Sequence, residues 1–315
     1  MNNLCIIIVN YNLTDCVKNL LISIEKYVAD IDCEIFVVDN NSQDRSIEKL
    51  AEQFPKVKFK MLKTNYGFGH GNNEVLRNYE SKYYLLLNPD TYLEENLPKK
   101  FYDFMEHNSD VGIAGPVVLY ENGRIQGSAQ NFHNLTNEFW DLFGLLGYYV
   151  AIKKRLKNTL TKSKEFYNTD YIFGSCMMIR NEVIKKTNGF DEDYFLFAEE
   201  TDLCYRAKKL CGEYKTVYWK NGSIRHLGGE ITNKIKSQRV KWTYESKLIF
   251  FRKHYSSLKV LIIRFVIVLN LIKKILPYMF NSNLKKEKDF KRVLVYLIKY
   301  YLVGNPVNNN KSIKQ

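Results

Sequence analysis

Apolar residues in the first half of the chain follow two spacings. Short apolar runs of strand length occupy residues 4–9, 34–38, 57–62 and 83–87. Between these runs, apolar residues recur at helical spacing, as at Val17, Leu20, Leu21 and Ile24. We therefore expect helices over residues 14–27, 46–54, 69–79 and 97–108. Strands that alternate with helices predict right-handed crossovers and an α/β fold with a mostly parallel central sheet.

Polar residues directly follow three of the predicted strands. They are Asn10, Tyr11 and Asn12 after the first strand, residues 39–42 after the second and residues 88–90 after the fourth. In parallel sheets, ligands bind at the carboxyl ends of the strands. We therefore expect all three groups to lie at the same edge of the sheet, next to a ligand.

The rest of the first 255 residues predicts fewer regular elements. We expect strands at residues 111–120, 172–179 and 215–219, and helices at residues 182–188 and 200–210. Residues 125–168 show no clear period, and we expect a mobile substrate-side loop with short helices there.

The C-terminal third changes character. Residues 258–276 are apolar but are interrupted by five polar residues, Lys259, Arg264, Asn270, Lys273 and Lys274. All of these except Arg264 fall within one arc of about 100° on a helical wheel. This pattern favours a helix that lies in a membrane interface over one that spans the membrane. The alternative is packing on the preceding α/β domain or on a second subunit. Residues 290–302 form a second apolar stretch, and residues 304–315 are expected to be disordered.

The chain is strongly basic, with a formal net charge of +13 over 315 residues. Such a charge suits nucleic acid, an anionic membrane or an anionic ligand. Nucleic acid is disfavoured, because the basic residues alternate with long aliphatic runs rather than with an exposed aromatic platform. The six cysteines form no Cys-x-x-Cys pair, and the N-terminus shows no signal-peptide pattern. We therefore expect reduced thiols in a cytoplasmic protein.

Acidic residues are concentrated in one segment of this basic chain. Six carboxylates lie among aromatic residues between Asp191 and Asp202. A further carboxylate, Asp90, follows the apolar run at residues 83–87. A carboxylate at the end of a buried strand, combined with distant carboxylates, predicts a site for a hard metal ion with a general base beside it.

Six segments in this order resemble glycosyltransferase family 2, which has the GT-A fold. They are residues 6–12 (IIIVNYN), 37–42 (VVDNNS), 65–73 (NYGFGHGNN), 86–90 (LLNPD), 174–180 (GSCMMIR) and 189–206, which begins with GFD. The resemblance covers residues 4 to about 255 and is greatest to the rhamnosyltransferase branch. It implies a catalytic domain at residues 1–255, and the apolar stretches described above predict an amphipathic helical extension at residues 256–303.

The resemblance also implies roles on the donor side of the site. Asp90 would hold Mg2+ or Mn2+ on the donor diphosphate, with Asn88 in place of the family's first acidic residue, and His226 would complete the metal shell. Asp39 would contact the base or ribose. The remaining donor-side candidates are Asn10, Tyr11, Asn12, Asn65, Gly67 and Asn73. The glycines at positions 67, 69 and 71 would let the backbone approach the donor closely.

On the acceptor side, the family has Glu-Asp where this chain has Glu199 and Glu200. We expect Glu200 to be the base, with Glu199 as the second candidate. Asp191, Phe197 and Gly174 are assigned to the acceptor side. Asp202 and Arg206 lie four residues apart on the predicted helix, so an internal ion pair is expected.

The resemblance implies an inverting, metal-dependent transferase that acts on a nucleotide-sugar donor. The first candidate donor is dTDP-rhamnose, followed by UDP-hexoses and UDP-galactofuranose. The acceptor would be a surface polysaccharide or its lipid-linked precursor, reached from the inner face of the cytoplasmic membrane. The sequence is compatible with a monomer or a homo-oligomer. One alternative is a non-catalytic binding subunit, suggested by Asn88 and Glu200. The other is a sugar nucleotidyltransferase, which would need a Gly-rich basic loop where this chain has residues 10–14.

Overall fold

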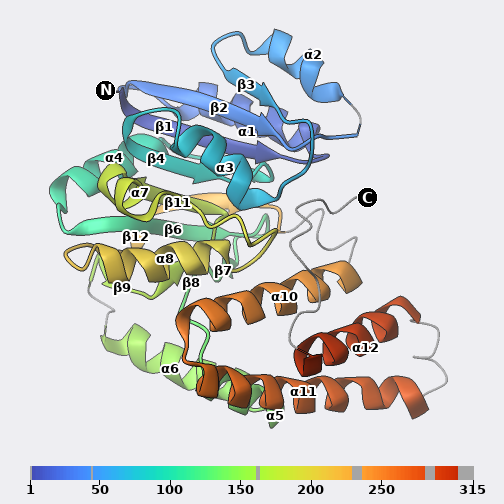
Figure 1. The fold of residues 1–315 in the computed structure, drawn as a ribbon. Helices are drawn as coiled ribbons and strands as arrows, with labels where there is room; N and C mark the ends of the chain where they lie inside the picture. The colour runs from blue at the N-terminus through green and yellow to red at the C-terminus, as the bar shows by residue number, and fades with distance from the viewer. Residues whose placement is uncertain (1, 44, 161–163, 229–235, 281–287, 304–315) are drawn as a thin grey trace. The chain divides into compact units, whose positions relative to one another are not determined.

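The computed structural model describes residues 2–43, 45–160, 164–228, 236–280 and 288–303. The chain forms two compact units. The first contains residues 1–132, 164–195 and 199–231, and the second contains residues 133–163, 196–198 and 232–315. Figure 1 shows the elements in the colours of the chain.

Four parallel strands form one half of the first unit's sheet, in the order β3-β2-β1-β4. Their bounds are β1 Asn2–Asn10, β2 Cys33–Asp39, β3 Lys58–Met61 and β4 Ser81–Leu87. Helices α1 (Thr14–Tyr27), α2 (Ser46–Gln53) and α3 (Phe68–Leu76) connect them. The apolar runs become the two-sided buried interior of the sheet, since β1 residues from Leu4 to Ile8 are fully buried.

The other half of the sheet mixes strand directions. Strand β11 (Cys176–Arg180) is antiparallel to both of its neighbours, β4 and β6 (Val111–Leu119). Strand β12 (Lys215–His226) is parallel to β6, and the short β5 (Thr91–Tyr92) closes the order as an antiparallel edge of β12. The predicted α/β class is confirmed, and the antiparallel β11 adds a feature that the alternation of strands and helices did not predict.

Shorter strands and further helices complete the first unit. Strands β7 (Ile125–Gln126) and β9 (Phe166–Asn168) pair with β6 and β12, while β8 (Ala129–Gln130) and β10 (Tyr171–Ile172) pair with each other. The helices are α4 Leu97–His107, α7 Asn181–Thr187 and α8 Glu199–Leu210. Figure 1 shows α3, α7 and α8 on one face of the sheet.

Several boundaries differ from the sequence prediction. The strand expected at residues 172–179 is two strands, β10 and β11, separated by residues 173–175. The strand expected at residues 215–219 continues to His226, because its second half pairs with β6 beyond an irregularity between Tyr218 and Ser223. The region 125–168, where a loop with short helices was expected, contains the short strands β7, β8 and β9 and two helices of 8 and 15 residues. The helices are α5 (Leu135–Leu142) and α6 (Leu146–Leu160), and Asn134 caps α5 by accepting a hydrogen bond from the Asn137 N–H.

The second unit is helical. Besides α5 and α6 it contains α10 (Lys236–His254), α11 (Ser257–Phe280) and α12 (Lys288–Val303). An ion pair joins Lys247 of α10 to the buried Glu138 of α5, and the Arg264 guanidinium of α11 donates to the carbonyls of Tyr301 and Leu302 in α12. Helix α10 was not predicted. Among the described residues, no helix is long and apolar enough to cross a membrane. The tail predicted at residues 304–315 lies outside the described residues.

Candidate active site

The polar residues that follow β1 and β2 meet at one edge of the sheet, as predicted. The parallel register places Asn10 opposite Asp39, and the Asn10 Nδ2 donates to Asp39 Oδ1 at 2.7 Å. Both side chains are buried. Ser42 closes the cluster, because its backbone N–H and its hydroxyl both donate to the Asp39 carboxylate. The Asp39 carboxylate is therefore fixed in orientation before any ligand arrives.

Asn12 joins the same cluster from the β1 side. It has a left-handed backbone with φ of 55°, its N–H donates to Ser42 Oγ, and its Oδ1 accepts from the Gln43 N–H. Asn12 is exposed and Tyr11 is half-buried. The loops after β1 and β2 thus support one another at the rim where the sequence predicted the nucleotide.

The glycine loop packs against the acidic segment of the same unit. A Cβ at Gly67 would lie 2.0 Å from the Phe195 carbonyl oxygen, and one at Gly69 would lie 3.1 Å from the Phe190 Cβ. The Asn73 side chain donates to the Phe190 carbonyl and accepts from the Phe190 N–H. Asn65 Oδ1 accepts from the Gly67 N–H. Close approach to protein atoms therefore accounts for glycine at positions 67 and 69.

Glu192 anchors this packing and explains part of the acidic cluster. Its carboxylate accepts from Arg77 at 2.6 Å and from Asn73 at 2.9 Å, and one oxygen lies 2.8 Å from His70 Nδ1. These contacts hold the pKa of Glu192 below its usual value, against the opposing effect of burial. The predicted Asp202–Arg206 ion pair is also confirmed, at 2.6 Å.

Asp90 and His226 lie side by side, although 136 positions separate them in the sequence. The pairing of β5 with β12 sets His226 opposite Thr91, and the Leu227 N–H donates to the Asp90 carbonyl. His226 Nε2 lies 3.1 Å from Asp90 Oδ1, and both side chains are buried. Asn88 starts this turn, since its carbonyl accepts from both the N–H and the hydroxyl of Thr91.

Gln126 fixes the orientation of the His226 ring. Its Oε1 lies 2.7 Å from His226 Nδ1, which assigns the ring proton to Nδ1. The buried Nε2 makes no hydrogen bond, although Asp90 Oδ1 lies 3.1 Å from it. A neutral imidazole whose other nitrogen is held by an acceptor is the usual form of a metal-binding histidine.

Asp90 Oδ1 and His226 Nε2 therefore fit a shared divalent cation. A carboxylate oxygen and an imidazole nitrogen both suit Mn2+, and the oxygen also suits Mg2+. No group of three or more His, Cys, Asp or Glu side chains that could hold a metal occurs in the part of the chain that the structure describes. The remaining ligands would have to come from water and a ligand such as a diphosphate.

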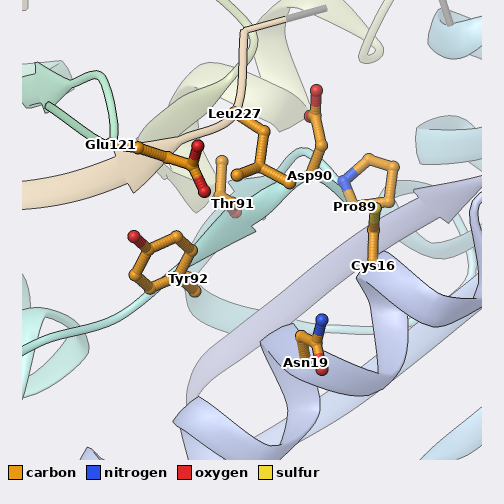
Figure 2. Close-up of a pocket in the computed structure, with 8 residues that line it drawn as sticks. All are labelled: Cys16, Asn19, Pro89, Asp90, Thr91, Tyr92, Glu121 and Leu227. Carbon is orange, nitrogen blue, oxygen red and sulfur yellow. The ribbon is translucent and has the colours of Figure 1, made fainter. Parts of the chain in front are cut away.

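A small cavity lies beside Asp90. Its volume is about 190 Å³, and Figure 2 shows Asp90, Glu121 and Leu227 around it, together with residues of α1. The complete lining is Cys16, Asn19, Pro89, Asp90, Thr91, Tyr92, Glu121 and Leu227. Among these, only Pro89 and Asp90 belong to a motif that the sequence singled out. Gln126 and Glu121 belong to no recognisable sequence motif. The pairing of β6, β7 and β12 brings them to the neighbourhood of Asp90 and His226.

Glu199 and Glu200 form the first turn of α8, after two residues in a left-handed conformation. Phe197 and Ala198 have φ of 70° and 65°. Two such non-glycine residues in sequence are strained, as often found at functional sites. The three residues Leu196–Ala198 group with the second unit, where Ser246 Oγ donates to the Leu196 carbonyl and the Arg239 guanidinium lies 5.9 Å from the Phe197 ring centroid.

The two glutamates have different environments. Glu199 is buried, and its Oε2 has no hydrogen-bond partner. Burial and the neighbouring charge of Glu200 raise the Glu199 pKa well above its usual value. Glu200 is only partly buried by surface area, and desolvation raises its pKa to about 7. A partly accessible carboxyl with a pKa near neutrality suits a general base better than a fully buried one.

The remaining acceptor-side candidates are placed as follows. Asp191 Oδ1 accepts from the Asp193 N–H, so it supports its own loop. A Cβ at Gly174 would lie 3.0 Å from the Phe68 ring, so the segment between β10 and β11 packs against the start of α3. Phe197 belongs to the second unit.

Comparison with solved structures shows which fold this is. The chain is similar to the mannosyltransferase PcManGT from Pyrobaculum calidifontis, solved in complex with GDP-Man and Mn2+, with a TM-score of 0.54. The match covers 96% of this chain and 87% of that chain at 12% identity. At this identity the similarity concerns the fold alone. The helix-flanked mixed sheet is thus the expected GT-A type.

Two relatives are similar to this chain in sequence. Rhamnosyltransferase WbbL from Escherichia coli (strain K12) is 25% identical over 211 residues, which is 64% of this chain and 75% of that protein. An N-acetylglucosaminyl-diphospho-decaprenol L-rhamnosyltransferase from Mycobacterium tuberculosis (strain CDC 1551 / Oshkosh) is 20% identical over 70% of this chain and 75% of its own length. The sequence model of glycosyl transferase family 2 matches residues 5–187, more than half of the chain. The chain therefore belongs to glycosyl transferase family 2, and its activity is that of a glycosyltransferase.

Proposed function

We propose that this glycosyltransferase moves a sugar, with inversion, from a nucleoside diphosphate donor to an acceptor hydroxyl, and that it requires a divalent cation. The observation that carries this proposal is the buried pair of Asp90 and His226, in which Nε2 has no hydrogen-bond partner and Gln126 fixes the ring. A cation held there, Mg2+ or Mn2+, would neutralise the charge that builds up on the leaving diphosphate.

The donor nucleoside is assigned to the rim formed by the loops after β1 and β2. Asp39 can accept hydrogen bonds from a ribose or base, and Asn10 and Ser42 already hold its carboxylate in place. Tyr11, Asn12 and Asn65 complete this side of the proposed site, and Asn88 borders the diphosphate. The names of the two relatives make dTDP-rhamnose the first donor to test, with UDP-sugars second.

Glu200 is the proposed base. Its carboxylate accepts the proton of the acceptor hydroxyl, and the freed oxygen forms a bond to the anomeric carbon. The bond from that carbon to the diphosphate oxygen breaks, and the nucleoside diphosphate leaves with the electron pair. Attack from the face opposite the leaving group inverts the anomeric configuration. Asp191, Gly174 and Phe197 are the proposed acceptor-side residues.

The proposed acceptor is a surface polysaccharide or its lipid-linked precursor. The mycobacterial relative is named for a diphospho-decaprenol-linked sugar. A lipid-linked acceptor would place the reaction at the inner face of the cytoplasmic membrane, with the protein bound there peripherally.

Thermal unfolding with added nucleotides tests the donor side of this proposal. UDP, dTDP, GDP and ADP would each be added with and without Mn2+ or Mg2+. A ligand at about 100 times its Kd adds about 2.7 kcal/mol of stability, so the shift is readable. We expect one nucleotide to raise the Tm only with the cation, and Asp90→Ala to abolish this shift. A Tm shift that is the same with and without the cation would contradict the metal role. The absence of a Tm shift with any nucleotide would contradict the donor class.

A further inference from the structure

The outer face of α11 carries a stripe of exposed apolar side chains. We call Leu258, Leu261, Ile262, Phe265, Leu269, Ile272 and Leu276 the apolar stripe. At 100° per residue these positions fall within an arc of about 100°. Leu258, Leu261 and Phe265 are 69%, 59% and 63% exposed. Single exposed apolar residues are ordinary, but an aligned set of seven is typical of an interaction surface.

The stripe is not the face with which α11 packs in its own unit. Ile263, Ile267 and Leu271, on another face of the helix, are buried. Asn270 donates to Asp141 of α5, and Lys274 also bonds to Asp141. Helix α11 is thus fixed in the second unit by other residues. The stripe extends over about 27 Å at the helical rise of 1.5 Å per residue.

The charges of the chain are divided unequally between the two units. The second unit has 24 of the 47 Lys and Arg residues but only 5 of the 34 Asp and Glu residues, a formal charge of +19. The first unit has the other 23 Lys and Arg residues and the other 29 Asp and Glu residues, which gives a formal charge of −6. Exposed Lys259 and Lys273 flank the stripe on one side of the helix. An apolar stripe in a strongly cationic unit matches an anionic, apolar surface.

We propose that the apolar stripe of α11 docks in the interface of an anionic lipid bilayer. The helix would lie along the membrane plane with its apolar side chains among the acyl chains and its lysines at the headgroups. A second copy of the chain is a poorer occupant, because two units of +19 would repel each other. The inference deepens the proposed membrane location, on which it rests, by naming the surface.

Vesicle co-flotation of the full-length protein tests the docking. The vesicles are phosphatidylcholine alone, or phosphatidylcholine with phosphatidylglycerol. We expect binding to the anionic vesicles that weakens with salt, and much weaker binding to phosphatidylcholine. The double variant Leu261→Glu/Phe265→Glu should lower the partition coefficient at least about 100-fold, since two apolar anchors become charged. The matched control Leu210→Glu, which alters a 54% exposed leucine of the first unit, should bind as the unaltered protein does.

Two further measurements distinguish loss of membrane binding from loss of folding, and membrane docking from dimerisation. Circular dichroism and the nucleotide-induced Tm shift verify that both variants fold and bind donor, so a failed membrane proposal stays distinct from a failed donor proposal. Equal binding of the double variant and the control would overturn the assignment of the stripe. Equal binding to both vesicle types would overturn the electrostatic part. Sedimentation without lipid should give a monomer, and a dimer that the double variant dissociates would assign the stripe to a second copy instead.

Discussion

The His226 side chain is positioned by residues that are far from it in the sequence. Gln126 of β7 holds Nδ1, and β5 brings Asp90 to Nε2. The sequence identified Asp90 and His226 through the family resemblance. It offered no signal for Gln126, because a lone glutamine at an exposed-looking strand end has no pattern of its own, and its partner is set by strand register.

Gln126→Leu should weaken cation binding by about 10- to 100-fold, because the ring of His226 loses the acceptor that fixes its tautomer. The measurement is the cation concentration needed for the nucleotide-dependent Tm shift. Gln126→Glu keeps an acceptor at the same place and should restore most of the affinity. An unchanged cation requirement in Gln126→Leu would show that the ring is positioned without this contact.

The two glutamates at the start of α8 can be separated by amide substitutions. Glu200→Gln should lower the transfer rate by roughly 10²-fold or more, because the amide cannot take the proton from the acceptor hydroxyl. The nucleotide-dependent Tm shift should persist, because Glu200 does not hold the donor in this scheme. Glu199→Gln is the matched control and should keep measurable transfer. The reverse pattern, with transfer lost only in Glu199→Gln, would move the base by one residue.

The raised pKa of Glu200 makes two linked predictions about pH. As the base, Glu200 must be ionised, so the transfer rate should fall as the pH decreases through about 7. For stability the sign is opposite. A carboxyl whose pKa is higher in the folded state than in the unfolded state makes folding less favourable as the pH rises from 4.5 through about 7.

Glu200→Gln should therefore be more stable than the unaltered protein at pH 8, and the difference should vanish below about pH 4. Urea unfolding at several pH values measures this difference. A variant that is less stable than the unaltered protein at pH 8 would show that the ionised carboxylate makes favourable contacts in the folded state.

At the scale of elements, apolar periodicity predicted most of the first unit. Residues 14–27 were expected to be a helix and are α1. Periodicity failed where tertiary pairing decides the length, as for β12, which runs to His226 along β6 and β5. It also failed for α10, whose apolar residues do not gather on one side, so no helical stripe was visible in residues 236–254.

The loop before α3 depends on a glycine that no other residue can replace. Gly67 has φ of 94° and ψ of 177°, a region open almost only to glycine, and a Cβ there would lie 2.0 Å from the Phe195 carbonyl oxygen. Gly67→Ala should therefore lower the free energy of unfolding by about 2 kcal/mol or more. Gly212→Ala, where a Cβ meets nothing within 4 Å, is the control. Equal stabilities in urea would contradict the close packing of this loop on residues 190–195.

At the scale of the whole molecule, donor chemistry and the proposed membrane surface belong to different compact units. The candidate donor and cation residues lie in the first unit, and the apolar stripe lies in the second. The sequence had suggested a basic C-terminal third, but it could not show which apolar residues of α11 remain exposed, because that depends on how α11 packs with α5 and α12.

Hydrogen exchange should separate the two functions. Nucleotide with Mn2+ should slow amide exchange in residues 10–12, 39–42, 88–92 and 226–227, because a bound ligand stabilises the segments that hold it. Anionic vesicles should instead slow exchange in α11. Protection of α11 by nucleotide alone, or of residues 88–92 by vesicles alone, would contradict this division.

The path of the chain around residues 196–198 has a mechanical consequence. These three residues group with the second unit, where Ser246 of α10 holds the Leu196 carbonyl, while Glu199 starts α8 in the first unit. The peptide bond between Ala198 and Glu199 thus joins a residue anchored on one body to the glutamate pair on the other. Any change in the strained φ angles of Phe197 and Ala198 would therefore alter the backbone directly before Glu199 and Glu200.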